Sequence, residues 1–330
     1  MTTVYTASNG AIVADLTALR AIPSTDLPVS GFVVLLVASE NNWFKYNPAL
    51  TSGDATPSDN PSIGRWLRIG RDKLTANRTY FVRTDGNDAN TGLINNSGGA
   101  FLTIPKAIDV ASSLDSTIYT PTIQLADGTY SAGSSYFNLK SFIGSAPITI
   151  QGNVSDASAV ILTGTNSDGV VQAYNVRGLY SFRYVTFTNT NNGHAINCQN
   201  SVIHHGNCVL GALGSGWGFV CANNGLITNA LNNAGYPLSI SGSMSGYFLL
   251  FGAAIVEFVN ATITAVGTPT FSSSGINCNS LSYVNTYNMV VSGSANGIRY
   301  SVSSNAVIGS SGVALLGSSA GSSSSGGLFL

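Results

Sequence analysis

Charged residues are scarce in this 330-residue chain, and they almost disappear from its second half. They make up 8% of the sequence, against about 25% in an ordinary soluble domain. From residue 170 to residue 330 the charged side chains are Arg177, Arg183, Glu257 and Arg299. Surface helices need a charged outer face, so this half cannot be built from them. Disorder does not fit either, because disordered segments combine low hydrophobicity with high net charge.

The sequence also lacks a net positive charge and a long apolar run, and these two absences bear on nucleic acids and membranes as partners. The net charge of −1 provides no basic field to hold nucleic acid or an anionic membrane. The longest apolar stretch near the start, residues 31–38, is too short to span a bilayer, and no basic segment with an apolar core precedes it as in a secretory signal. We therefore expect neither nucleic-acid binding nor membrane insertion.

Cysteine is rare, and its spacing contains no CxxC pair. A zinc site is therefore not expected, and neither is a disulfide framework. Buried free thiols are the expected state, and the sequence predicts no metal and no other cofactor. The four cysteines are Cys198, Cys208, Cys221 and Cys278.

The charge-poor half contains Ser, Asn, Gly and Thr alternating with Val, Ile, Leu and Phe. Five inward–outward–inward triplets recur, with third residues 23, 30, 27 and 22 apart, and a second short strand follows each triplet. Periods of 20 to 50 residues indicate a solenoid, and strands without helices favour a parallel β-helix. The triplets are 196–198, 219–221, 249–251, 276–278 and 298–300; the second strands begin with 202–203, 226–227, 255–256, 283–284 and 307–308.

This alignment also accounts for three of the cysteines. Cys198, Cys221 and Cys278 fall at one position of their coils and are expected to stack in the core as small hydrophobic residues. Adjacent coils lie about 4.8 Å apart. Cys198 and Cys221 could therefore touch, and whether they are bonded stays open.

Two units are expected. Residues 1–75 form a small mixed module with a helical segment at 14–22, strands at 32–38, 43–46 and 64–69, and a loop at 51–62. Residues 76–330 form the all-β unit. An amphipathic helix at 104–114 stands near its start, with Pro105 in the first turn. The uncharged Gly/Ser-rich end, residues 309–330, has the composition of a linker, but its apolar residues favour a final coil.

Several stretches of the second unit are similar to a known family. Residues 81–92, 101–104 and the helix that contains 106–108 resemble the opening of pectate-lyase-like right-handed β-helices, in which the helix caps the solenoid. Residues 126–130 and 148–152 match the next coils. Within that superfamily the arrangement is similar to tailspikes and tail fibres of tailed bacteriophages. Residues 14–23, 43–46 and 64–68 look like the small module that often precedes phage β-helices.

The resemblance implies a homotrimer located in the virion and attached to a phage tail or capsid protein through residues 1–75. Three functions remain open. The first is a virion appendage that binds a host cell-surface polysaccharide. The second is a glycan depolymerase, a hydrolase or a lyase, on the same β-helix. The third is a capsid-decorating or tail-assembly fibre without a sugar role.

Catalytic candidates are few, which makes the enzyme hypothesis the weaker one. Glycan hydrolysis uses paired carboxylates, and the weak candidates here are Asp168, in a turn sequence, and Glu257, in a strand that points it outward. A pair of them would span about three coils. The segment 85–90 superficially resembles a calcium loop but lacks the later Glu, so an Asx-turn cap is the better interpretation.

Four residues, Trp217, Tyr236, Tyr247 and His204, are the main candidates for sugar contact. Trp217 lies between glycines, from which it could protrude and stack on a sugar ring, or fold over the end of a coil as core. Tyr236 and Tyr247 are weaker candidates of the same kind. His204 and His205 must face opposite sides of a strand; His204, like His194, could serve as an acid, a base or a sugar contact, although an ordinary surface histidine is the simpler expectation.

Overall fold

The structure is a computed structural model, and it describes residues 12–13, 16–22, 34–37, 42–47, 56–57, 65–69, 72–229 and 237–330. Contacts divide the chain into two units. One comprises Met1–Thr75 with Ser113–Asp115, and the other comprises Ala76–Ser112 with Ser116–Leu330. Each unit has its own sheet system.

The first unit contains a five-stranded mixed sheet in the order β1-β2-β3-β5-β4. β1 and β2 are parallel, and the other pairs are antiparallel. Leu19, Phe44 and Tyr46 are buried. The expected strands are present as β2, β3 and β5, and β4 lies inside the expected loop. The bounds are β1 Ile12–Val13, α1 Leu16–Arg20, β2 Val34–Val37, β3 Asn42–Asn47, β4 Thr56–Pro57 and β5 Arg65–Ile69.

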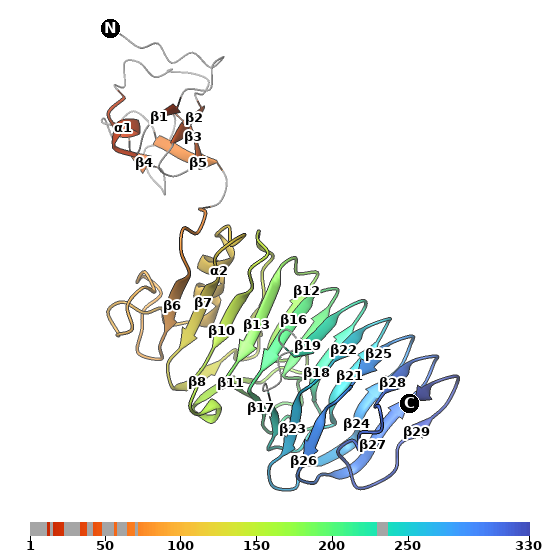
Figure 1. Cartoon of the computed structure of the whole chain (residues 1–330). Helices are drawn as coiled ribbons and strands as arrows, with labels where there is room; N and C mark the ends of the chain where they lie inside the picture. Colours follow the sequence, from red (N-terminus) through yellow and green to blue (C-terminus); the bar gives the residue numbers. More distant parts are fainter. Residues whose placement is uncertain are drawn as a thin grey trace. The chain divides into compact units, whose positions relative to one another are not determined.

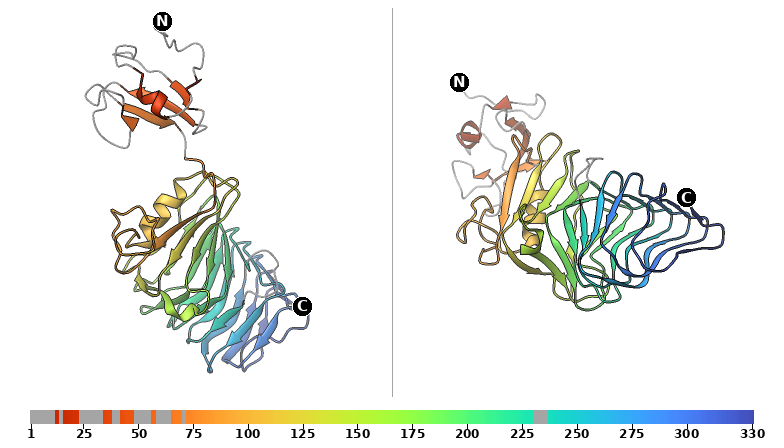
Figure 2. Two further views of the ribbon diagram at one scale, coloured as in Figure 1. Left: turned by 60° about the vertical axis from the view of Figure 1, so that its left-hand side comes forward. Right: turned by 60° about the horizontal axis from the view of Figure 1, so that its bottom comes forward.

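The second unit is a parallel β-solenoid, which confirms the predicted β-helix. Its strands stack along the column in three parallel sheets (Figures 1 and 2). The ten-stranded sheet contains β6 Arg78–Val82, β7 Pro121–Leu125, β10 Ile148–Gln151, β13 Leu179–Arg183, β16 Val202–Gly206, β19 Leu226–Asn229, β22 Ile255–Glu257, β25 Tyr283–Asn285, β28 Val307–Gly309 and β30 Leu328–Phe329.

The other two sheets complete each coil. The seven-stranded sheet contains β8 Gly128–Ser131, β11 Val160–Gly164, β14 Thr186–Asn189, β17 Cys208–Leu210, β20 Leu238–Ile240, β23 Thr262–Ala265 and β26 Val290–Ser292. The eight-stranded sheet contains β9 Phe137–Asn138, β12 Val171–Tyr174, β15 Ile196–Gln199, β18 Trp217–Ala222, β21 Gly246–Phe251, β24 Thr270–Cys278, β27 Asn296–Val302 and β29 Ser322–Ser323.

Asparagine forms the corner between the eight-stranded and the ten-stranded sheets. Asn175, Asn200 and Asn223 have φ values of 54°, 45° and 49°, in the left-handed region that Asn tolerates better than most residues. Their side chains also stack, since the Asn200 amide donates to Asn175 Oδ1 over 2.8 Å. The Asn-rich turns of the sequence therefore serve both to bend the chain and to join adjacent coils.

A single helix of nine residues covers the start of the solenoid. α2, Ile104–Ser112, buries Ile104, Ala107, Ile108 and Ala111 and packs against β6, β7 and β9. It ends two residues before the predicted Leu114, which is itself buried. In the described part of the chain, no helix has the length and apolar character needed to cross a membrane.

The predicted repeat is correct in most coils and wrong in two. Ile196 pairs with Phe219, but Phe219 pairs with Phe248 rather than Leu249, so Phe248 and Leu250 point inward. Residues 247–251 are all apolar, and alternation cannot set the register of such a run. In the last coil Ile276 pairs with Tyr300, not Ile298, because a register irregularity lies in β24. The five predicted second strands align as expected.

The cysteines are buried free thiols, as predicted. Cys198 and Cys221 are direct partners on adjacent strands, and Cys278 stands two coils further, beyond Leu250. Burial and the neighbouring Cys198 thiol raise the pKa of Cys221 well above its usual value. The Gly/Ser-rich end is ordered in a last coil: β30 pairs with β28, Leu315 and Leu316 are buried, and the Phe329 ring stacks on Tyr300 at 4.0 Å.

A histidine occupies the apolar interior of the solenoid. His205 is fully buried, its ring lies 4.8 Å from Phe219 and 5.1 Å from Phe258 between ring centroids, and neither nitrogen has a hydrogen-bond partner among the described residues. Burial, with a smaller contribution from His204, lowers the pKa of His205 to about 3. The imidazole is therefore neutral in the folded protein.

This core histidine predicts acid sensitivity. The folded pKa lies below the value of about 6.5 in the unfolded chain. Stability is therefore unaffected above pH 6.5 and falls by about 1 kcal/mol per pH unit as the pH drops from 6.5 toward 3. Urea unfolding between pH 7 and pH 4 measures the slope. In His205→Leu that slope should be shallower, and His204→Gln should change it less, because the pKa of the outer-face His204 is lowered by a smaller amount. Equal slopes in wild type and His205→Leu would contradict the assignment.

Candidate functional site

The structure does not bring the two carboxylate candidates together within one chain. Asp168 is exposed in the turn before β12, where Asn166 Oδ1 accepts hydrogen bonds from the backbone nitrogens of Asp168 (2.8 Å) and Gly169 (2.7 Å). Glu257 ends β22 on the outer face of the ten-stranded sheet. Asp168 lies in the turn between β11 and β12, Glu257 lies in the ten-stranded sheet, and three full coils separate them. No acid–base pair is formed between them.

Trp217 does not protrude, which corrects one of the two interpretations left open by the sequence. Its side chain is 8% exposed and packs against Gly246, where an added Cβ would lie 2.5 Å from the indole. An added Cβ on Gly216 would lie 2.1 Å from the carbonyl oxygen of Gly193. Glycine at position 216 thus lets the backbone pass close to the preceding coil, and glycine at position 246 of the following coil leaves room for the Trp217 ring. Trp217 is therefore part of the packed end of the coil.

Tyr247 is also unsuited to sugar contact, contrary to expectation. It is fully buried, with its ring 4.9 Å from Phe248 and 5.5 Å from Phe271 between centroids, and burial raises its pKa. Tyr236, the remaining tyrosine candidate, lies outside the described residues.

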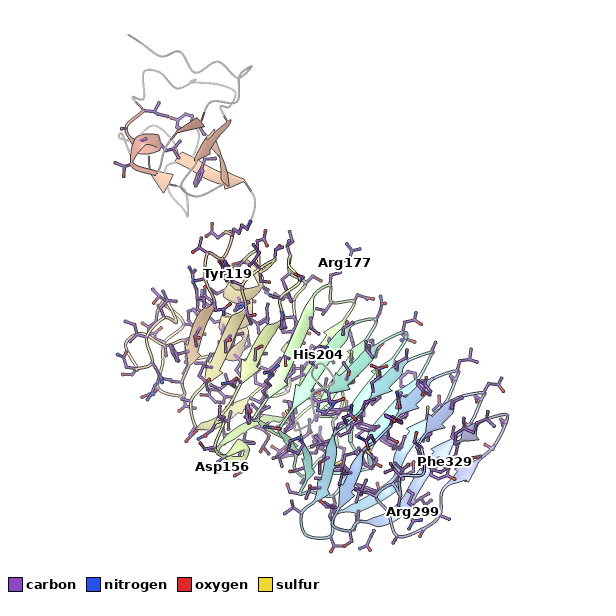
Figure 3. All side chains as sticks on the ribbon, in the orientation of Figure 1. Tyr119, Asp156, Arg177, His204, Arg299 and Phe329 are labelled. Atoms are coloured by element: carbon purple, nitrogen blue, oxygen red, sulfur yellow. The ribbon has the colours of Figure 1, made fainter. Side chains whose placement is uncertain are left out.

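His204 and His205 face opposite sides of β16, as predicted. His204 lies on the outer face of the ten-stranded sheet (Figure 3), but neighbouring side chains leave it only 8% exposed. Burial, and then the positive charge of Arg183, lower its pKa. The expectation of an ordinary surface histidine is therefore wrong, because Ser181 and Thr228 flank His204 on the adjacent strands.

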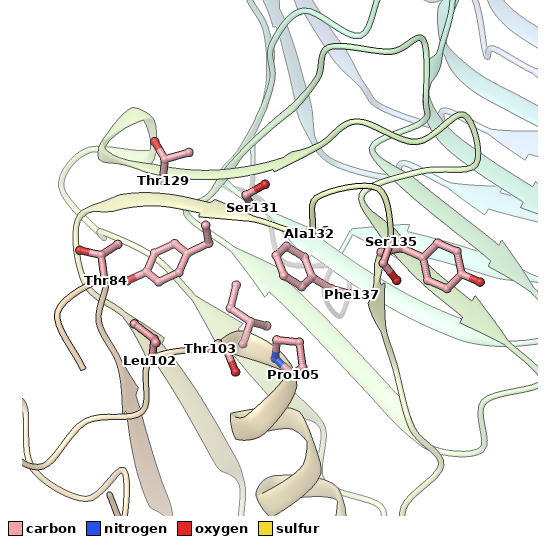
Figure 4. A pocket seen from close by; sticks show the side chains of 12 residues that line it. Thr84, Leu102, Thr103, Pro105, Thr129, Ser131, Ala132, Ser135 and Phe137 are labelled. Atoms are coloured by element: carbon pink, nitrogen blue, oxygen red, sulfur yellow. The ribbon is translucent and has the colours of Figure 1, made fainter. Parts of the chain in front are cut away.

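A pocket that the sequence did not indicate lies beside the cap helix. We call it the hydroxyl pocket; it has a volume of about 380 Å³, within the usual range of small-molecule sites. Figure 4 shows Thr129 and Ser131 of β8 on one side and Thr103 and Pro105 at the helix start on the other. The lining residues are Thr84, Leu102, Thr103, Ile104, Pro105, Thr129, Tyr130, Ser131, Ala132, Ser135, Tyr136 and Phe137.

The floor and the helix side of the hydroxyl pocket are rigidly held. The Tyr130 hydroxyl lies 2.9 Å from the carbonyl oxygens of both Val82 and Ala126, and burial raises its pKa to about 12. Thr103 caps α2, since its Oγ1 accepts from the Lys106 backbone nitrogen at 3.3 Å. None of the twelve lining residues is a carboxylate, a histidine or a lysine or arginine, so the pocket carries no formal charge at neutral pH.

A hydrogen-bonded row of side chains lies on the outer face of the eight-stranded sheet. We call it the amide row; it consists of Tyr174, Asn197, Gln199 and Asn223. Asn197 Nδ2 donates to the Tyr174 hydroxyl (2.9 Å), Gln199 Nε2 donates to Asn197 Oδ1 (3.3 Å), and Asn223 Nδ2 donates to Gln199 Oε1 (3.0 Å). Tyr174 is 45% exposed. The row therefore presents an aromatic ring and amides in fixed orientations.

The hydroxyl pocket and the amide row are neighbours. Phe137, which lines the pocket, pairs with Val171 of β12, the strand that ends at Tyr174. The pKa of Tyr174 is raised mainly by burial and then by Asp168 and Tyr136. Asn166 joins the rim to the Asp168 turn, because its side-chain amide donates to the Ser135 and Gly169 carbonyls. Asp168 also acts on His194, whose pKa burial lowers and the Asp168 charge raises.

His194 has a structural contact that fixes its tautomer. The backbone nitrogen of Trp217 donates to His194 Nδ1 over 3.0 Å. Nδ1 is therefore the acceptor, and in the neutral ring Nε2 carries the proton. His194 is thus available as a hydrogen-bond donor near Asp168, rather than as a base through Nδ1.

Sequence reasoning missed both the hydroxyl pocket and the amide row. One usable signal was present: Asn138, Gln172 and Asn197 occupy equivalent positions of successive coils and form a polar ladder in register. The pocket had no such signal, because its walls come from segments as far apart as Thr84 and Phe137.

The fold defines a class, that of parallel β-solenoids with an N-terminal cap helix, and the site adds an uncharged hydroxyl and amide surface. No protein-family model matches the chain, and no curated protein matches it at a significant level.

The loop 85–90 that resembles a calcium site is used for capping. Asp88 accepts from the backbone nitrogens of Leu102 and Thr103, each at 2.9 Å, and from Thr103 Oγ1 at 2.7 Å. Asn87 Oδ1 accepts from the Ala89 nitrogen at 2.9 Å, an Asx turn. Asp85 forms an ion pair with Arg83 at 2.8 Å. The Asx-turn interpretation of this segment is therefore confirmed.

Removal of this cap should destabilise the solenoid. We expect Asp88→Ala to lower the free energy of unfolding by about 1–2 kcal/mol, because three donors lose their acceptor. Asp85→Asn, which removes an exposed ion pair, should leave the free energy of unfolding nearly unchanged. Urea denaturation measures both. A rise in melting temperature on adding calcium, reversed by a chelator, would contradict a purely capping role.

Proposed function

We propose that this chain is a virion appendage of a tailed bacteriophage, a tailspike or tail fibre, that binds a neutral host cell-surface glycan. The uncharged hydroxyl pocket next to the exposed Tyr174 of the amide row is the observation that carries the sugar-binding part. The virion part rests on the resemblance of residues 81–92 and 101–108 to the start of phage β-helices. It includes assembly as a homotrimer and attachment through residues 1–75 to a phage tail or capsid protein.

Sugar recognition suits the chemistry of these residues. Hydroxyl and amide groups both donate and accept hydrogen bonds, as the hydroxyls of a sugar require. Aromatic faces, here Tyr136 and Tyr174, pack on the apolar C–H face of a sugar ring. The pocket could hold one residue of a polysaccharide while the amide row supports its neighbours. A neutral glycan is favoured because no cation lines the pocket to pair with a uronic acid or a sialic acid.

Glycan binding predicts a specific mutational pattern. Tyr174→Ala should weaken binding about tenfold through loss of the aromatic face, whereas Tyr174→Phe should retain most of it. The matched control is Tyr287→Ala, a tyrosine 58% exposed in the loop after β25. The measurement is binding to a panel of purified neutral and acidic bacterial surface polysaccharides. Binding confined to acidic polysaccharides, or an equal loss in Tyr287→Ala, would overturn the assignment.

The alternative to glycan binding alone is cleavage of the glycan. One feature supports it, because Asp168 and His194, two groups that can transfer protons, lie near each other. We expect no cleavage, because hydrolysis uses paired carboxylates and the two candidates, Asp168 and Glu257, lie on different parts of the solenoid. Prolonged incubation with a polysaccharide that binds should release no new reducing ends and no unsaturated sugars. If cleavage occurs and is lost in Asp168→Asn or in Glu257→Gln, the depolymerase hypothesis replaces the binding one.

The third hypothesis is a capsid-decorating or tail-assembly fibre without a sugar role. It differs from the glycan-binding appendage in that the protein binds no polysaccharide, and its place on the virion can be the capsid instead of the tail. Antibody labelling of virions at the tail or at the capsid facets distinguishes the two attachments. The absence of binding to every polysaccharide in the panel would favour the assembly fibre.

A further inference from the structure

The outer face of the ten-stranded sheet carries an apolar ladder. One outward residue from each of seven successive strands, β13 to β30, stands in register with the next. These strands run side by side along the column in Figure 1. We call this set the outer apolar ladder; its members are Leu179, Val202, Leu226, Ile255, Tyr283, Val307 and Leu328.

The outer apolar ladder is accessible in the single chain. Val202, Ile255 and Tyr283 are 37%, 38% and 38% exposed, and Leu328 is 52% exposed. The Tyr283 ring lies over the following coil, where its hydroxyl would be 3.2 Å from a Cβ added to Gly309. Glycine at that position therefore lets the ring lie flat along the face instead of standing out from it.

The other two sheets lack such a ladder. A sheet face exposed to water is normally polar, and the outward positions of the seven-stranded sheet are mainly hydroxyl residues such as Thr186, Ser239 and Thr264. The eight-stranded sheet presents the amide row. An apolar row of this length is thus particular to the ten-stranded sheet. The next outward row of the same sheet is polar and consists of Ser181, His204, Thr228, Glu257 and Asn285.

Charge around the outer apolar ladder is minimal. On strands β13 to β30 of this sheet the charged residues are Arg183, on the first strand, and Glu257, in the middle. Covering the outer apolar ladder would remove few charged side chains from water. Loss of hydration by an unpaired charge is a large cost of burying a protein surface, and that cost is small here. Apolar patches that continue over many residues mark sites of association.

The spacing between successive residues of the outer apolar ladder limits which partner can pack on it. Its rungs recur at the strand spacing of about 4.8 Å, so seven rungs extend over about 29 Å. A partner must present apolar groups with the same spacing over the same length. A second copy of this chain does so, whereas a helix, with a rise of 1.5 Å per residue, does not stay in phase.

We infer that the outer apolar ladder packs against the same ladder of other copies of this chain, with the coils at equal heights. Each rung then meets its own counterpart, Val202 with Val202 and Ile255 with Ile255. The parallel direction rests on the proposed homotrimer, in which all copies attach through residues 1–75. The apolar contact itself follows from the ladder and not from sugar binding.

Disulfide trapping in the full chain tests the contact and its direction. Val202→Cys and Ile255→Cys should each give a covalent dimer on oxidation, because equal rungs face each other. In an antiparallel contact centred on Ile255, Val202 would face Val307, and only Ile255→Cys would cross-link. Val290→Cys, 59% exposed on the seven-stranded sheet, is the matched control. The four native cysteines are buried and should not interfere.

The expected result is cross-linking of both ladder variants and none of the control. Cross-linking of Ile255→Cys alone, of none, or of the control to the same extent would overturn the inference. Light scattering gives a second measurement: the double variant Val202→Glu with Ile255→Glu should fall to the mass of one chain, and Val290→Glu should keep the wild-type mass. A monomeric wild-type protein at micromolar concentration would also overturn it.

Failure of this inference can be told apart from failure of the proposed function. The hydroxyl pocket and the amide row lie within one chain, so a monomeric ladder variant should keep its affinity per site for a soluble oligosaccharide released from a bound polysaccharide. It should lose avidity for the intact polymer, because multivalent attachment is lost. If Tyr174→Ala loses sugar binding while the oligomer stays intact, the result bears on the sugar site and leaves the ladder contact unaffected.

Discussion

In-register stacking between coils is the constraint on which the molecule depends. Each inward side chain lies between the equivalent side chains of the coils before and after it, as Phe219 lies between Ile196 and Phe248. A coil buries only a few apolar residues by itself, and the core becomes continuous only through this stacking. Because the strands are parallel and in register, the outward side chains stack as well. Rows of similar residues therefore form along the outer faces, as in the outer apolar ladder.

The scarcity of charge follows from the same constraint. Equivalent outward positions are neighbours at about 4.8 Å, and like charges placed opposite one another on adjacent strands are destabilising. Amides and hydroxyls instead bond to their own kind along the stack, as Asn288 does to Asn260 at 2.8 Å and Ser292 to Thr264 at 2.9 Å. A chain of this kind gains stability by repeating neutral polar residues, which is what its second half does.

The proposed sugar site lies where this regularity is weakest. At the cap, the helix start and the loop before β9 leave the hydroxyl pocket between them, and the amide row continues from it onto regular coils. The outer apolar ladder lies on a different sheet. The proposed sugar binding and the proposed self-association would thus use separate faces, so one copy could do both without competition between them.

Much of the fold was predictable from the sequence, and most of the site was not. Alternation placed the strands that begin with Val202, Leu226, Ile255, Tyr283 and Val307, and the cap helix was recognised from its apolar face. Alternation failed at residues 247–251, where every residue is apolar and two registers satisfy the same pattern. Alternation also could not decide whether Trp217 is exposed or buried. Its flanking glycines are compatible both with a protruding loop and with a close approach of the backbone to the next coil.

By itself, the sequence determined the stacked-strand architecture, the cap and the shared position of Cys198 and Cys221, because these depend on periodicity along the chain. Only the tertiary structure decided that Tyr247 and Trp217 are buried, that Asp168 and Glu257 are apart, and that Tyr136 lines a pocket beside the strand that carries Tyr174. Those outcomes depend on which coils become neighbours and on how the corners turn, and such contacts between distant segments leave no periodic trace in the sequence.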